Sequence, residues 1–209
     1  LLCNMTNAGI PDSAMMNDLQ TVGNAQISTS VKKFGTGSIA FDGNNDWLKM
    51  PVSQGFNFGT GDFTIEGWVN VPSVNSTYRC LFSVGGPTQI YAINGTIEVY
   101  FNDSDDNSSY IVNGATGPAN SITTNTWAHF AVVRNSTTFT VYVNGVAGTP
   151  VTGVSASVVL SATGPYVGTY GPSTSLYPFT GYVDELRITK GYARYTGNFT
   201  VPSGPFSDK

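Results

Sequence analysis

Residues 127–145 read WAHFAVVRNSTTFTVYVNG, and this stretch predicts two neighbouring β-strands. Residues 126–134 are apolar on both faces, as expected of a strand buried between two layers. Residues 137–144 instead alternate between apolar and polar side chains, which is the period of a half-buried strand. Asn144 and Gly145 then provide a two-residue hairpin turn, because both tolerate the positive φ that such a turn requires. The stretch therefore favours a layered β protein.

The same alternation continues on both sides of this stretch. Residues 62–71 (DFTIEGWVNV) place Phe63, Ile65 and Val69 on one face. Further strands are predicted at residues 38–41, 47–50, 80–84, 89–93, 96–101, 110–112, 158–160, 166–168 and 179–189. Turn residues separate these segments about every 8–12 positions, which is typical of an antiparallel sandwich. We predict one all-β domain over residues 1–209, with a short helical turn near the C-terminus at residues 190–195.

The composition excludes several classes of function. The chain has 209 residues, of which 11% are charged and 12% aromatic, with a net charge of −4. Charged residues are about a quarter of an average globular chain, so neutral Ser, Thr and Asn side chains must make this surface polar. The nine basic residues are scattered, which disfavours nucleic acid as a partner. No apolar run approaches the roughly 20 residues that span a bilayer, so no membrane insertion is expected.

Five segments, taken in order, carry a family resemblance. They are GNAQISTSVKKFGTGSIAFDG (23–43), FDGNNDWLKM (41–50), GDFTIEGWVNV (61–71), WAHFAVVRNSTTFTVYVNG (127–145) and FTGYVDELRITKGYARYTGNFTVPSGPF (179–206). Together they resemble the concanavalin A-like lectin and laminin-G superfamily, in its laminin-G-like domain 3 branch. The last segment is similar to modules of bacteriophage tail and virion structural proteins. The resemblance implies a two-sheet antiparallel jelly-roll β-sandwich, which is usually a non-catalytic module that binds glycan or protein.

No catalytic constellation is visible in the sequence. A glycosidase needs two carboxylates about 5–10 Å apart, and enzymes that resemble this family carry them in a Glu-x-Asp-x-Glu run. The three glutamates, Glu66, Glu98 and Glu185, belong to no such run. Glu66 and Glu98 each lie in a Thr-Ile-Glu strand, where solvent or a cross-strand partner is expected. His129 is the only histidine and is interpreted as a hydrogen-bonded strand residue, because one histidine builds neither a multi-histidine zinc site nor a triad by itself. The chain is not expected to be an enzyme.

Three aspartates are candidates for a structural calcium site. Simple alternation places Asp184 on the face of Tyr182, Leu186 and Ile188, where an ionised carboxylate needs a hydrogen-bond partner or a cation. Asp42 and Asp46 are possible co-ligands, since the resembling modules bring their segment close to that of Asp184. Calcium favours six to eight oxygen ligands, which a β-turn can help to supply. The alternative is that Asp42 and Asp184 only cap backbone amides.

Two polar loops supply the predicted ligand-binding residues. Residues 102–109 are acidic and residues 162–178 are rich in Gly, Pro, Ser and Tyr, and binding residues are often found on such loops. Sugars bind through aromatic faces and fixed polar groups, and Tyr loses little entropy on binding. The predicted ligand-binding residues are Tyr91, Asn102, Asp103, Asp105, Tyr110, Tyr166, Tyr170 and Tyr177.

The sequence leaves three functions open. The first is a lectin-like module at a phage or virion surface, extracellular in location, that contacts a host-surface glycan. The second is a structural or decoration domain that contacts other virion subunits in a fibre, knob or capsid, with a homo-oligomer, a trimer, as the expected assembly. The third is a bacterial adhesin or the binding module of a larger secreted enzyme.

Overall fold

Two antiparallel sheets of seven strands pack face to face in the computed structural model, which describes residues 10, 18–104, 109–159, 162–171 and 176–207. The first sheet has the order β1 (Gln20–Val22), β4 (Trp47–Lys49), β13 (Tyr166–Val167), β6 (Arg79–Ser83), β7 (Thr88–Ile93), β8 (Thr96–Asn102) and β9 (Tyr110–Thr116). The second has the order β12 (Val146–Ala147), β11 (Thr138–Val143), β10 (Ala128–Asn135), β5 (Phe63–Asn70), β14 (Thr180–Lys190), β3 (Ser38–Asp42) and β2 (Gln26–Ser28).

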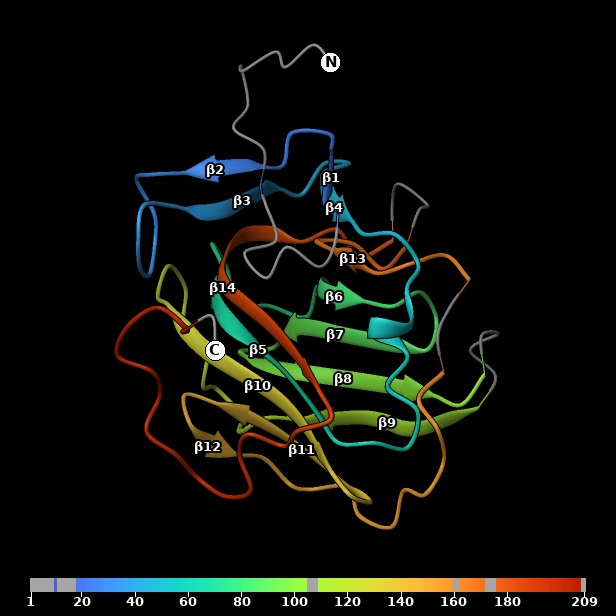
Figure 1. Ribbon diagram of the computed structural model, residues 1–209. Helices are drawn as coiled ribbons and strands as arrows, with labels where there is room; N and C mark the ends of the chain where they lie inside the picture. Colours follow the sequence, from blue (N-terminus) through green and yellow to red (C-terminus); the bar gives the residue numbers. More distant parts are fainter. Residues whose placement is uncertain (1–9, 11–17, 105–108, 160–161, 172–175, 208–209) are drawn as a thin grey trace.

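Strands far apart in the chain are neighbours in both sheets, as Figure 1 shows. β14, near the C-terminus, lies between β3 and β5, and β13 lies between β4 and β6. Such crossovers between two antiparallel sheets are those of a jelly roll. The structure confirms the predicted all-β jelly-roll sandwich. No helix in the described part of the chain has the length and apolarity needed to cross a membrane.

The core lies between the inner faces of the two sheets. Phe63 of β5 is fully buried, and its ring centroid lies 5.6 Å from that of Phe101 on β8 and 5.9 Å from that of Phe139 on β11. Fully burying one such side chain contributes about 1.5–3 kcal/mol. The alternation of residues 62–71 therefore predicted the buried face of β5 correctly, since Phe63, Ile65 and Val69 all join this core.

The turn after β11 also forms as predicted. Asn144 and Gly145 have φ angles of +51° and +78°, and they join β11 to the two-residue strand β12. A side chain at Gly145 would meet the backbone carbonyl oxygen of Phe199 at 2.0 Å. The turn thus needs glycine both for its backbone angle and for the close approach of the segment near the C-terminus.

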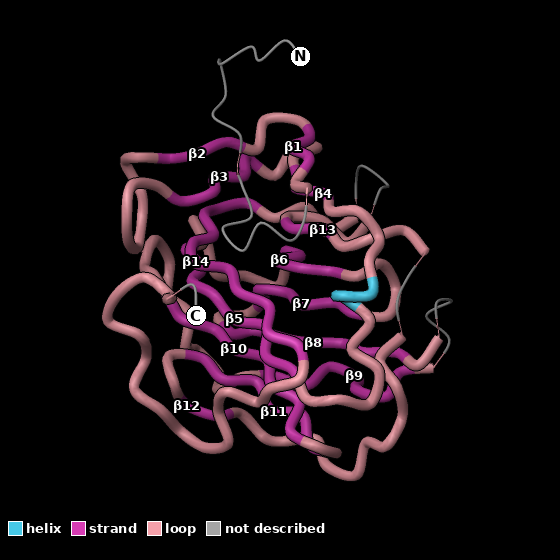
Figure 2. The backbone as a smooth tube through the Cα atoms, viewed as in Figure 1, coloured by secondary structure: helices cyan, strands magenta, loops and turns pink. Residues whose placement is uncertain are grey.

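The predicted helical turn is in the wrong place. Residues 191–195 follow directly on β14 without helical structure, and the helical element of the described residues is a 3₁₀ turn at Gln54–Phe56, drawn in cyan in Figure 2. Hydrogen bonds to β5 explain the difference, because the Arg194 amide donates to Thr64 Oγ1, and Thr64 Oγ1 donates to the Tyr192 carbonyl. These contacts hold the backbone flat against the sheet.

A β-bulge in β14 separates Asp184 from Leu186 and Ile188, two of the residues predicted to share its face. The pairing with β5 shifts register between Asp184 and Arg187, and Glu185 has a φ of +51°. Consequently Leu186 packs against the core, whereas Asp184 lies opposite Trp68 on the outer face of the second sheet. An extra residue in one strand reverses the alternation beyond it, which a simple period of two does not anticipate.

Candidate functional site

Six tyrosine side chains gather on the outer face of the first sheet. They are Tyr78, Tyr91, Tyr100, Tyr110, Tyr170 and Tyr177, and we refer to them as the tyrosine surface. The Tyr91 ring centroid lies 5.1 Å from that of Tyr78 and 5.5 Å from that of Tyr177. The Tyr100 and Tyr110 centroids lie 5.4 Å apart. Most of these contacts are edge-to-face or tilted, the arrangements that aromatic pairs prefer.

Strand periodicity explains how β7 and β8 supply the centre of this surface. Ile90 and Val99 point into the core, so their neighbours Tyr91 and Tyr100 point away from it. Tyr91 lies directly opposite Glu98 in the register of the two strands. Directly opposite side chains in an antiparallel pair approach closely enough to interact, which brings aromatic rings and a carboxylate together here.

The tyrosine surface has an exposed layer above a buried one. Tyr110 and Tyr177 are each 42% exposed, whereas Tyr91 is 3% exposed. The Tyr91 hydroxyl donates a hydrogen bond of 3.1 Å to Gln89 Oε1, and burial raises its pKa above the ordinary value. Tyr91 therefore stays neutral and supports the exposed rings, while Tyr110 and Tyr177 remain available to a ligand.

Glu98 is the acidic group at the centre of this surface. Its Oε1 atom accepts hydrogen bonds from the hydroxyls of Tyr100 and Tyr78, the latter at 3.3 Å. Burial raises the pKa of Tyr100, and the hydrogen bond to Glu98 raises it further, so the phenol keeps its proton. Carboxylate oxygens hold about four acceptor positions, which leaves capacity at Glu98 for a ligand hydroxyl.

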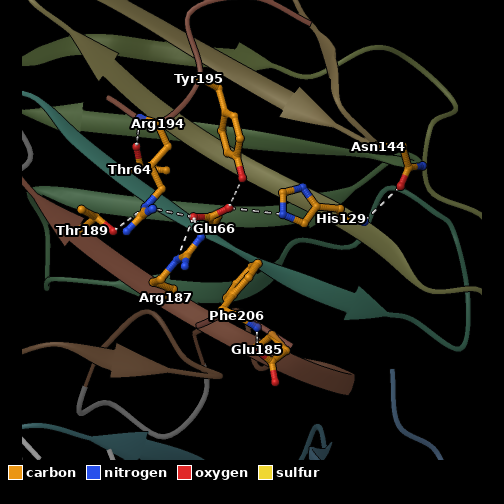
Figure 3. Close-up of polar contacts among 10 residues, drawn as sticks. All are labelled: Thr64, Glu66, His129, Asn144, Glu185, Arg187, Thr189, Arg194, Tyr195 and Phe206. Atoms are coloured by element: carbon orange, nitrogen blue, oxygen red, sulfur yellow. Dashed lines mark hydrogen bonds and ion pairs between the residues drawn. The ribbon is translucent and has the colours of Figure 1, made fainter. Parts of the chain in front are cut away.

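A second polar cluster lies on the outer face of the other sheet, around Glu66. The carboxylate is fully buried, and its Oε1 accepts two hydrogen bonds from Arg187, of 2.7 and 3.0 Å (Figure 3). Oε2 accepts a bond of 2.7 Å from the Tyr195 hydroxyl and lies 3.4 Å from His129 Nε2. Arg194 Nε lies 3.5 Å from Oε1. Glu66 is thus enclosed by its partners.

The C-terminal segment, residues 191–207, covers this cluster. It crosses the outer face of the second sheet, and its Tyr195 ring stacks on Phe199 at 3.5 Å between centroids. The Cζ atom of the Arg187 guanidinium lies 3.9 Å from the centre of the Phe206 ring. Burial alone would raise the pKa of Glu66, but the contacts with His129, Tyr195 and Arg187 outweigh burial and lower it. The cluster holds a charged carboxylate and fastens the C-terminal segment to the sheet.

A family model described as the concanavalin A-like lectin/glucanases superfamily, laminin G type 3, matches residues 42–193. The chain belongs to this superfamily. The match covers both sheets from the end of β3 to the end of β14 and includes the tyrosine surface. No protein with a curated description matches the chain.

Several solved structures, two of them binding domains of toxins, share this concanavalin A-like fold. The binding domain of Paraclostridial Mosquitocidal Protein 1 is 18% identical over 88% of this chain and 48% of its own, with a TM-score of 0.68. Domain 4 of AbnA, an extracellular arabinanase from Geobacillus stearothermophilus solved with arabinotriose, is 19% identical over 85% and 83%, with a TM-score of 0.59. The botulinum neurotoxin serotype D binding domain is 13% identical over 85% and 44%, with a TM-score of 0.60. The chain spans about half the length of the two toxin domains.

The structure brings together some of the ligand-binding residues predicted for this concanavalin A-like domain. Tyr91, Tyr110, Tyr170 and Tyr177 all belong to the tyrosine surface. Two further residues of the tyrosine surface, Tyr78 and Tyr100, were not predicted from the sequence, although the alternation of β8 places Tyr100 on the face of Glu98. Glycan binding by any of these residues stays a prediction.

The other predicted ligand residues do not join the tyrosine surface. Tyr166 is 1% exposed, and its hydroxyl donates to the Thr163 carbonyl. Asn102 is fully buried and donates to the Gly86 carbonyl, so both side chains serve packing. Asp103 lies exposed in the bend after β8, and Asp105 lies outside the described residues.

The three predicted metal ligands do not form one group. Among the residues that the structure describes, no three His, Cys, Asp or Glu side chains gather as a metal site. Asp46 Oδ2 accepts the Asp42 amide at 2.6 Å, which closes the turn between β3 and β4. Asp46 Oδ1 is buried without a partner among the described residues, and burial raises the pKa of this carboxyl. Calcium binding by this turn stays a prediction.

Asp184 instead caps backbone amides. Its Oδ2 accepts hydrogen bonds from the amides of Lys33 and Phe34, at 2.8 and 3.1 Å, and its Oδ1 accepts the Glu185 amide at 2.9 Å. This is the alternative to calcium that the sequence left open. Lys33 Nζ also lies 4.0 Å from the centre of the Trp68 ring. The loop between β2 and β3, which contains Lys33 and Phe34, is therefore fixed to the sheet at two points.

We expect Asp184→Asn to lower the free energy of unfolding by about 1–2 kcal/mol, because an amide replaces a charged acceptor of three backbone hydrogen bonds. Thermal melts of the wild type and the variant, each in calcium and in EDTA, measure this. The loss should be equal in both buffers. A loss that occurs only in calcium would show instead that Asp184 holds a cation.

Melts of the wild type and of Asp46→Asn in the same two buffers test the Asp42–Asp46 turn. Calcium bound at this turn would raise the Tm of the wild type, and Asp46→Asn would abolish the rise.

Proposed function

We propose that the chain is a non-catalytic carbohydrate-binding module that holds a glycan on the tyrosine surface. The observation that carries this proposal is the gathering of six tyrosine rings on one sheet face, two of which, Tyr78 and Tyr100, donate hydrogen bonds to Glu98. Rigid aromatic rings pack on the apolar C–H faces of sugars, and tyrosine loses little rotamer freedom on doing so. Fixed polar groups beside the rings then select the hydroxyl pattern.

The chemistry of this surface favours a neutral glycan. Glu98 is its acidic group, and its remaining acceptor positions suit sugar hydroxyls, which donate hydrogen bonds. Tyr110 and Tyr177 offer exposed ring faces on either side of the buried Tyr91. An anionic sugar would meet the Glu98 carboxylate, and like charges brought together in a partly desolvated site repel.

The compared structures support a binding role at the level of the fold. Domain 4 of AbnA was solved with arabinotriose, and the two toxin domains are named as binding domains. One fold hosts many activities, so the residues of the tyrosine surface carry the assignment rather than the likeness.

The placement of the glutamates supports a role without catalysis. Glu66 and Glu98 lie on the outer faces of opposite sheets, and packed sheets are about 10 Å apart. Side chains that point outward from both layers are separated by more than the 5–10 Å that a glycosidase pair spans. Glu185 accepts the Phe206 amide and belongs to the C-terminal segment's contacts. Glu66 and Glu98 therefore do not assemble into a hydrolytic pair.

We place the module at an extracellular or virion surface, where it would contact a host glycan. The support is the resemblance of the C-terminal block, residues 179–206, to modules of phage tail and virion structural proteins. The block builds β14 and the segment that covers Glu66.

A glycan array tests the proposal. The array should include neutral bacterial and plant oligosaccharides, arabinotriose among them, and matched glycans that end in sialic or uronic acid. We expect binding to neutral glycans and weaker or no binding to the acidic members. An intact fold that binds no glycan, or that binds only acidic ones, would contradict the proposal.

A further inference from the structure

A pocket lies at the β2 edge of the second sheet, away from the tyrosine surface. It has a volume of about 290 Å³. Its lining consists of Asn24, Gln26, Ala40, Phe41, Asp42, Pro72, Thr180, Gly181 and Tyr182. Small-molecule pockets span about 300–1,000 Å³, so this one holds one small ring rather than an extended chain.

The register of three neighbouring strands explains the hollow. Gln26 on β2, Ala40 on β3 and Tyr182 on β14 lie in one row across the sheet. Val183 belongs to the core, so its neighbour Tyr182 points to the outer face, and the row shares that direction. The methyl group of Ala40 between two longer side chains leaves space that a larger residue would fill.

The lining combines an apolar wall with hydrogen-bonding groups. Tyr182 and Pro72 provide ring and carbon surface, and the Gln26 amide is exposed beside them. Asp42 is held in place, since its Oδ1 accepts the Asn44 amide at 2.8 Å and its Oδ2 accepts Asn24 Nδ2 at 3.2 Å. A carboxylate fixed in this way keeps acceptor capacity for ligand hydroxyls.

The charge of the lining selects the class of ligand. Asp42 is its single ionisable carboxylate, and no Lys or Arg is among these lining residues. An anionic ligand would have no cationic partner and would face a fixed carboxylate. A neutral polyol ring, with an apolar face for Tyr182 and hydroxyl donors for Asp42, matches both parts of the lining.

We propose that this pocket is a second carbohydrate site, which takes one neutral monosaccharide unit. The inference rests on the pocket and is independent of the tyrosine surface. With both sites occupied, one chain would hold glycan units at the outer faces of both sheets.

The test is a protein-observed NMR titration of the whole chain. The probes are methyl α-D-glucopyranoside, methyl α-D-galactopyranoside and methyl α-L-arabinofuranoside, with glucuronic acid as the anionic comparison. We expect at least one neutral probe to cause saturable shifts at the amides of Gln26, Asp42 and Tyr182, with a Kd of about 1–50 mM. Glucuronic acid should leave these amides unchanged.

Three variants locate the effect. Ala40→Leu fills the pocket without removing a hydrogen bond, Gln26→Ala removes an exposed amide, and Tyr182→Ala removes the aromatic wall. We expect Ala40→Leu and Tyr182→Ala to abolish the shifts and Gln26→Ala to weaken them at least threefold, with Tm of Gln26→Ala unchanged. The proposal is overturned when no neutral probe moves the pocket amides, or when their shifts persist in all three variants. Shifts only at Tyr110 and Tyr177 would overturn the pocket while supporting the tyrosine surface.

Discussion

Replacing Glu66 with Ala should destabilise the chain by about 3–5 kcal/mol, because breaking a buried ion pair leaves its partners uncompensated. The carboxylate is fully buried, and it pairs with Arg187 and Arg194 and accepts the hydrogen bond of the Tyr195 hydroxyl. The substitution also removes one attachment of the C-terminal segment to β5, the hydrogen bond from Tyr195, while the bonds through Thr64 remain. Urea unfolding of the wild type and the variant measures the free energy, and limited proteolysis should show earlier cleavage after β14.

The pH dependence of stability gives an independent reading of Glu66. Its pKa lies below the ordinary 4.5, so the unfolded chain binds the proton more tightly than the folded chain does. The stabilisation by Glu66 is therefore complete above pH 4.5 and is lost as the pH falls through the lower folded value. We expect the Glu66→Ala variant to show a flatter fall in stability below pH 4.5. A fall as steep as that of the wild type would contradict the role given to Glu66.

A double-mutant cycle separates the ion pair from general damage to the sheet. Glu66→Ala, Arg187→Ala and the double variant should show a coupling energy of at least about 1 kcal/mol, since residues in one network are not additive. Glu185→Gln is the matched control, because its carboxylate accepts a single backbone amide in the same segment. The control should cost less than half as much as Glu66→Ala.

Removing the two exposed rings of the tyrosine surface should lower glycan affinity about a hundredfold. Tyr110→Ala and Tyr177→Ala are each expected to cost about tenfold, or about 1.4 kcal/mol, as truncation of an aromatic anchor does. Both residues are 42% exposed, so the fold should tolerate either change. Calorimetric titration with the strongest oligosaccharide from the array measures the affinity.

Two comparisons make this result specific. Tyr192→Ala removes a tyrosine that is 61% exposed in the C-terminal segment and should leave the affinity unchanged. Tyr110→Phe and Tyr177→Phe keep the ring and should retain most of the binding if stacking dominates. Equal losses in Tyr192→Ala, or full affinity in the double variant, would remove the tyrosine surface from the binding site.

The alternation of apolar and polar residues predicted the main strands of the sandwich well. The stretch at residues 127–145 became β10 and β11 with the expected Asn144-Gly145 turn, and residues 62–71 became β5. The short edge strands β1, β2 and β12 were missed, whereas the equally short β4 and β13 were predicted, at residues 47–50 and 166–168. Which strands pair with one another could not be predicted either, because the pairing depends on crossovers between distant segments.

The candidate site was only partly predictable for the same reason. The alternation of β7 and β8 fixes Tyr91 and Tyr100 on one face, but Tyr78 comes from a loop whose course is set by tertiary packing. Glu66 is similar, since nothing local to its Thr-Ile-Glu strand indicates that Tyr195 will cover it. The bulge at Glu185 is likewise a tertiary adjustment, and it turns Leu186 and Ile188 to the core while Asp184 stays on the outer face.

Chemical protection of tyrosines by a bound glycan tests the central claim most directly. Nitration of the wild type with tetranitromethane, with and without a saturating oligosaccharide, followed by peptide mass spectrometry, reports each ring separately. We predict that the glycan slows nitration of Tyr110 and Tyr177 and leaves Tyr192 as reactive as before. Unchanged nitration of Tyr110 and Tyr177 while the glycan is bound would contradict the assignment of the tyrosine surface as the glycan site.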